Sequence, residues 1–123
     1  MANSDGHCIF EYLYRDASNY KVGDTLLLTG HLSEADEAKI KACLDAGIYF
    51  VAEQVGIPPL YEPLWALSDG PTDDDHAFHE FIALRHATKK ERNSLPIFSD
   101  LQTLIKTFQS VSSWDCFLSP NCI

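Results

Sequence analysis

The stretch Phe78-His-Glu-Phe-Ile-Ala-Leu84 decides the fold, because the segment around it fits two secondary structures. Residues 71–93 carry helix signals: Thr72 suits an N-cap, three aspartates follow it, and basic residues come near the end. On such a helix, however, Arg85 falls within the apolar arc, and residues 78–84 have the aromatic and β-branched content of a buried strand. We therefore predict a strand over this stretch and keep a helix over residues 73–92 as the alternative.

Three further strands are predicted upstream, the first two joined as a hairpin by a long connection. Residues 16–23 are rich in turn formers, and Thr25-Leu-Leu-Leu-Thr29 forms the second strand. The segment Ile48-Tyr-Phe-Val51 indicates a third strand. In the first strand, residues 8–15, the alternation places three aromatic side chains on one side: Phe10, Tyr12 and Tyr14.

Two helices are predicted from their capping residues. Ser33 with Asp36 starts the first helix, and Gly47 is its expected stop. Ser99 with Gln102 forms the capping box of the second helix, whose apolar residues recur at helical spacing: Leu101, Leu104, Ile105, Phe108 and Val111. The elements together predict an α+β fold, with an antiparallel or mixed sheet of about four strands and two helices packed on one face.

The composition fits one globular domain over residues 1–123. Of these residues 46% are hydrophobic, and 9 Lys+Arg against 18 Asp+Glu give a net charge of -9. Such a charge repels phosphates, so we expect no nucleic-acid partner. The one basic cluster, Lys89, Lys90 and Arg92, is interrupted by Glu91 and suits a solvated turn or the end of an element. No apolar run is long enough for a membrane span, so we expect no membrane partner.

We expect a cytoplasmic protein with reduced thiols. Residues 1–6 carry no positive run of the kind found in signal or transit peptides. The four cysteines, Cys8, Cys43, Cys116 and Cys122, are too few and too scattered for a disulfide scaffold. Whether Cys116 and Cys122 pair stays open, since only a short loop through Pro120 separates them.

A candidate metal site lies in Asp73-Asp-Asp-His-Ala-Phe-His-Glu80, because carboxylates and imidazoles are the ligands that Zn prefers. On a helix, His76, His79 and Glu80 would share one face. On a strand, His79 points away from the other two, which are then about 13 Å apart. The predicted strand therefore argues against one ion held by all three. We expect no cofactor, and the alternative is a divalent metal such as Zn, held with help from Asp73 or Asp75.

A candidate polar site follows the aromatic strand, where loops held by rigid strands often carry function. It consists of Arg15, Asp16, Asn19, Tyr20 and Lys21. No nucleophile motif surrounds the neighbouring Ser18. The polar side chains of this loop equally suit a turn that they cap through hydrogen bonds to the backbone.

The Pro-rich loop over residues 56–71 contains a candidate partner surface of Leu60, Tyr61 and Trp65. Because large apolar side chains are costly to leave in water, this loop either packs on the body or meets a partner.

Two functions follow from these features. The first is a non-catalytic protein-binding or regulatory domain, with a protein partner or a second copy of itself. The alternative is a small metal-dependent hydrolase-like enzyme that uses His76, His79 and Glu80 and a metal-bound water. The sequence leaves open whether the chain is an enzyme.

Overall fold

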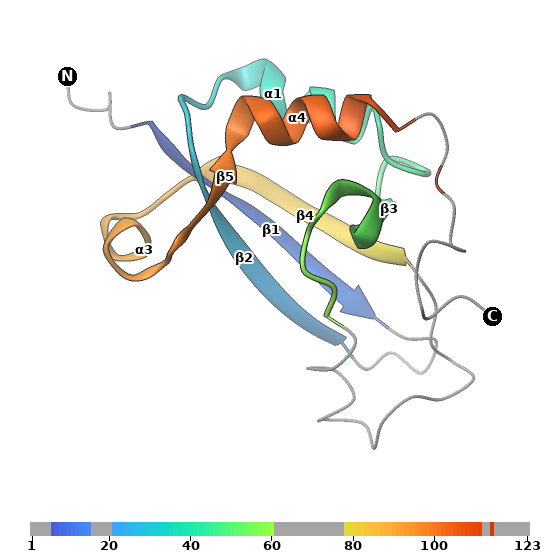
Figure 1. Cartoon of the computed structure of the whole chain (residues 1–123), viewed down its shortest axis with the longest axis horizontal. Helices are drawn as coiled ribbons and strands as arrows, with labels where there is room; N and C mark the ends of the chain where they lie inside the picture. Colours follow the sequence, from blue (N-terminus) through green and yellow to red (C-terminus); the bar gives the residue numbers. More distant parts are fainter. Residues whose placement is uncertain (1–5, 16–20, 61–77, 112–113, 115–123) are drawn as a thin grey trace.

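A five-stranded sheet forms the body of the protein, with two helices, α1 and α4, over one of its faces (Figure 1). The computed structural model describes residues 6–15, 21–60, 78–111 and 114. Along the chain the elements are β1 (His7–Arg15), β2 (Lys21–Thr29), α1 (Glu34–Lys41), β3 (Tyr49–Val51), the 3-10 helix η2 (Ala52–Val55), β4 (Phe78–His86), α3 (Lys89–Ser94), β5 (Ile97–Asp100) and α4 (Leu101–Gln109). The order across the sheet is β3-β4-β1-β2-β5. The predicted α+β class is confirmed.

The central strand β1 pairs antiparallel with β2 on one side and with β4 on the other. β3 is antiparallel to β4, whereas β5 runs parallel to β2, so the sheet is mixed. Between β1 and β4 the register shifts: Glu11 lies opposite Ala83, but Tyr12 lies opposite Phe81. Ile82 is therefore the extra residue of a β-bulge, which bends β4 and re-aims its side chains.

The core lies between the sheet and the helices, where the aromatic face of β1 meets α1 and α4. The Phe10 ring centroid is 5.2 to 5.9 Å from four other ring centroids: Tyr12, Phe50, Phe81 and Phe108. The predicted stripe of α4 is confirmed, because Leu101, Leu104, Ile105 and Phe108 are all buried. The aromatic alternation of β1 and the stripe of α4 thus form the two sides of one apolar layer.

The disputed segment is a strand, so the prediction made from residues 78–84 is confirmed and the helix alternative is wrong over Phe78–His86. The predicted strand at residues 48–51 is confirmed as β3. The Ser33–Asp36 capping box is also confirmed, with the Ser33 amide donating to Asp36 Oδ2 over 2.8 Å. The helix that it starts ends at Lys41, however, and Gly47 is not its stop. Turns follow Lys41 instead, and two of their residues, Ala46 and Gly47, have positive φ angles of 55 and 72°.

Three further expectations need correction. The N-cap of α4 is Asp100 rather than Ser99, because the Asp100 carboxylate accepts from the amides of Gln102 and Thr103. The four residues Ile97–Asp100 form a fifth strand, which the sequence did not reveal because they are so few and follow a proline. The basic cluster lies in the short helix α3 and not in a turn, with Lys89 and Lys90 at the end of this element as the other expectation had it; a capping box of Thr88 and Glu91 starts the helix.

Candidate functional site

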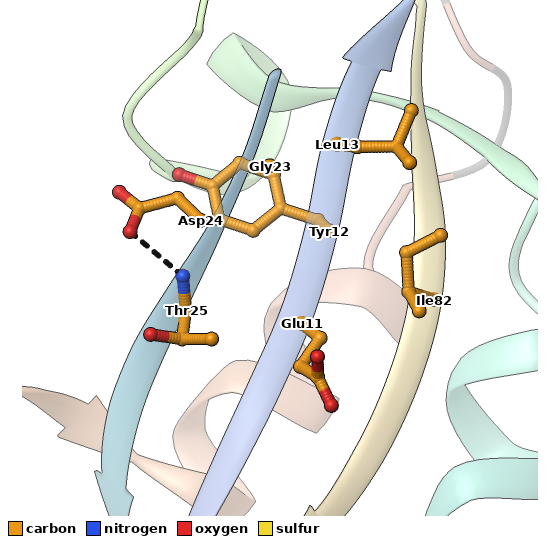
Figure 2. A pocket seen from close by; sticks show the side chains of 7 residues that line it. All are labelled: Glu11, Tyr12, Leu13, Gly23, Asp24, Thr25 and Ile82. Atoms are coloured by element: carbon orange, nitrogen blue, oxygen red, sulfur yellow. Dashed lines mark hydrogen bonds between the residues drawn. The ribbon is translucent and has the colours of Figure 1, made fainter. Parts of the chain in front are cut away.

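The face of the sheet opposite α1 and α4 carries an open groove of about 440 Å³ (Figure 2). Its lining comes from the three adjacent strands β1, β2 and β4: Glu11, Tyr12, Leu13, Gly23, Asp24, Thr25 and Ile82. Because side chains alternate along a strand, Glu11, Leu13 and Thr25 point to this face while Tyr12 points into the core. The groove therefore lies on the side of the sheet that the two helices leave open.

Two backbone features give the groove its shape. Ile82, the bulge residue, is 48% exposed, which makes it one of the most exposed large hydrophobic side chains among the described residues. Gly23 lies opposite Leu13 in the β1–β2 ladder and has no side chain to fill the space between them. A Cβ atom on Gly23 would lie 3.3 Å from the Tyr12 carbonyl oxygen and 3.7 Å from Leu13 Cβ. The groove is consequently low at Gly23, with the apolar side chains of Leu13 and Ile82 and the polar ones of Glu11 and Thr25 around it.

One end of the groove is bounded by a charged cluster around Arg85. Its guanidinium donates to Glu11 over 2.6 Å and to both carboxylate oxygens of Glu91 over 2.7 and 2.8 Å. The hydrogen bond from Arg85 and that from the Thr88 amide lower the pKa of Glu91 to about 2. The same two carboxylates, Glu91 and then Glu11, raise the pKa of Arg85. These ion pairs hold α3 against β1 and β4, so the charged cluster has a structural role.

The predicted polar site is described only at its two ends. Arg15 and Lys21 are opposite each other in the β1–β2 ladder, and Lys21 is exposed. Arg15 Nε donates to Glu80 Oε2 over 3.1 Å, which links the end of β1 to β4. Asp16, Asn19 and Tyr20 lie outside the described residues.

The two described members of the predicted metal site point to opposite faces of β4. His79 is fully buried, and its Nε2 accepts from the Leu60 amide over 3.0 Å. Its ring centroid lies 5.1 to 6.1 Å from those of Tyr12, Tyr14 and Phe50. Glu80 is held on the other face by Arg15. The remaining candidates, Asp73, Asp75 and His76, lie outside the described residues, and within the described ranges no three His, Cys, Asp or Glu side chains form a metal-binding group.

The described part of the predicted partner surface belongs to the core. Leu60 is only 4% exposed, and the hydrogen bond from its backbone amide to His79 Nε2 holds the end of the segment 57–60 in place. The Tyr12 hydroxyl donates to the Pro58 carbonyl over 2.8 Å and fixes the same segment. Tyr61 and Trp65 lie outside the described residues.

The described cysteines are free thiols in environments that disfavour a thiolate. Burial, followed by the charges of Asp36 and Asp100, raises the pKa of Cys8 to about 12. Burial also raises the pKa of Cys43, whose Sγ donates to the Lys39 carbonyl over 3.3 Å. Nucleophilic cysteines need the opposite shift. Cys116 and Cys122 are outside the described residues.

Sequence reasoning missed the groove. Alternation placed Glu11 and Leu13 on the side away from the aromatic face, but it gave no sign of which side the helices would leave open. The exposed position of Ile82 depends on the bulge, which is a property of strand pairing and has no local sequence signal.

No family model matches the chain, and neither a curated protein nor a solved structure matches it. None of the described helices has the length and apolar character needed to cross a membrane.

Proposed function

We propose that this chain is a non-catalytic protein-binding domain of the cytoplasm, and that the groove on the open face of the sheet receives its partner. The observation that carries the proposal is Ile82, a large apolar side chain held 48% exposed beside Leu13 in an open cavity. Burying such a side chain against a partner gains roughly 25 cal/mol for each Å² of apolar surface removed from water. A concave site that combines apolar side chains with a few polar groups is typical of binding sites.

The chemistry of the groove defines the partner. An apolar side chain of the partner would lie between Leu13 and Ile82, over the low point at Gly23. The Thr25 hydroxyl at the margin is able to donate to or accept from a partner backbone. The net charge of -9 favours a partner with a basic surface, because opposite charges steer association. The proposed partner is therefore a basic protein that presents an apolar side chain.

The proposal is tested by photo-cross-linking followed by binding measurements. A photoreactive phenylalanine analogue at position 82 should capture a partner that the same analogue at position 48 does not. Ile48 is the matched control, because it is 41% exposed but does not line the groove.

The captured protein is then purified and titrated against the variants Ile82→Asp and Ile48→Asp. A charge placed in a buried apolar contact weakens binding about tenfold or more, so only Ile82→Asp should raise Kd by that factor. Equal Kd values for Ile82→Asp and the wild type would refute the groove as the binding site.

A further inference from the structure

As far as the described residues go, β2 has an open edge along its first half. β2 spans nine residues, but β5 pairs only with Leu27, Leu28 and Thr29. Figure 1 shows β2 continuing well past the end of β5. Among the described residues no strand pairs with Lys21–Leu26 on the side away from β1. Open strand edges present unpaired backbone groups that pair readily with another strand.

The hydrogen bonds of Thr25 reveal which backbone groups face this edge. The Thr25 amide donates to the Asp24 side chain over 2.8 Å and so points away from Glu11, its partner in β1. In an antiparallel ladder the direction alternates, which means that Lys21, Gly23 and Thr25 all direct their backbone groups to the open edge. Two of the usual protections of an edge are missing here, since the segment 21–25 contains no proline and no bulge; the charged side chains of Lys21 and Asp24 are present, and Asp24 accepts from the Thr25 amide.

These three residues are arranged symmetrically around Gly23. If a second β2 runs antiparallel with its own Gly23 opposite, Lys21 of each copy lies opposite Thr25 of the other. All three positions are then hydrogen-bonded pairs with two backbone bonds each, and the Thr25 amide exchanges its bond to the Asp24 side chain for one to Lys21 of the second copy. The paired segment ends before Leu27, where β5 occupies the edge of both copies.

The charges along β2 are compatible with the same register. On the open face of the sheet, Lys21 is the ladder partner of Arg15, and Thr25 is the ladder partner of Glu11. In the symmetric arrangement Lys21 of one copy therefore lies opposite the neutral Thr25 of the other, and no two like charges are directly opposite each other across the edge. The arrangement occurs twice, because a two-fold interface repeats every contact.

We infer that two copies of this chain form a two-fold dimer by antiparallel pairing of the β2 edges around Gly23. The sheet then runs continuously through both copies. Because Gly23 and Thr25 also line the groove, the two grooves adjoin each other across the two-fold axis. This inference does not depend on the proposed function, since the dimer forms or fails to form without a partner.

The dimer is tested by sedimentation velocity on the full-length chain over a range of concentrations. Three variants of solvent-accessible side chains probe the register. Thr25→Glu places a carboxylate opposite Lys21 of the second copy, so the dimer Kd should fall about fivefold. Thr25→Lys places like charges opposite each other, so Kd should rise about fivefold. The double variant Lys21→Glu/Thr25→Lys restores opposite charges and should return Kd to near the wild-type value.

Lys39→Gln on α1 is the control, because it makes the same change of net charge as Thr25→Glu, one unit more negative, away from the edge and should leave Kd unchanged. Hydrogen exchange locates the contact independently: protection at residues 21–25 should rise with protein concentration, whereas that at residues 97–100 should not. A monomer at all concentrations would overturn the inference. So would a dimer on which Thr25→Glu and Thr25→Lys act in the same direction, or one whose protection appears elsewhere.

Discussion

Replacing His79 tests how the centre of the sheet is built. The ring is fully buried against Tyr12, Tyr14 and Phe50, and its Nε2 accepts from the Leu60 amide. His79→Ala removes the ring and leaves that buried amide without its acceptor. The cavity and the lost hydrogen bond together cost about 4 kcal/mol, by comparison with other large-to-alanine core substitutions.

His79→Gln separates the two contributions. Its side-chain oxygen reaches approximately the position of Nε2 and preserves the acceptor, so the variant should lose only packing, about 2 kcal/mol. The assay is urea unfolding followed by circular dichroism. With a slope of about 2 kcal/mol per molar urea, His79→Ala should lower the midpoint by about 2 M and His79→Gln by about 1 M. A midpoint within a few tenths molar of the wild type for His79→Ala would refute the buried position of the ring.

Three more changes follow from individual contacts. Cys8 should resist iodoacetamide at pH 8 in the folded protein, because its pKa is raised to about 12, and it should react once urea is added. Mass spectrometry of the labelled chain measures the extent of reaction. Prompt labelling of Cys8 in the folded protein would count against its burial. Because the folded pKa of Glu91 is lowered to about 2, the stability that Glu91 contributes is present above the unfolded carboxylate pKa of about 4.3 and is lost as pH falls toward 2. The difference in urea midpoint between wild type and Glu91→Gln should therefore shrink over that range, and a constant difference would contradict the ion cluster. Asp100→Ala should destabilise the protein by about 1 kcal/mol in thermal unfolding, whereas Ser99→Ala should not, because Asp100 is the N-cap of α4. A larger loss of stability for Ser99→Ala than for Asp100→Ala would indicate that Ser99 is the N-cap.

The elements that depend on local pattern were predictable from the sequence. The aromatic alternation of β1 and the helical spacing of α4 both describe which side of an element is apolar, and both sides are buried as expected. The strand at Phe78–His86 was decided by Arg85, whose charge does not fit the apolar face of a helix. In the sheet this charge is satisfied by Glu11 and Glu91, which come from two other elements.

The features that depend on pairing were not predictable. β5 is a strand only because β2 offers it an edge, and its four residues carry no alternation of their own. The groove exists because Ile82 is an extra residue in the β1–β4 ladder and because the helices cover the opposite face. Neither the register of two strands nor the choice of face can be inferred from the residues of one strand.

The amide spectrum of the ¹⁵N-labelled chain, recorded with and without its purified partner, tests the location of binding most directly. A partner seated on the open face of the sheet shifts the amides of Leu13, Thr25 and Ile82 most strongly and leaves those of α1 and α4 in place. Shifts concentrated on α1 and α4, with the groove amides unchanged, would contradict the proposed site.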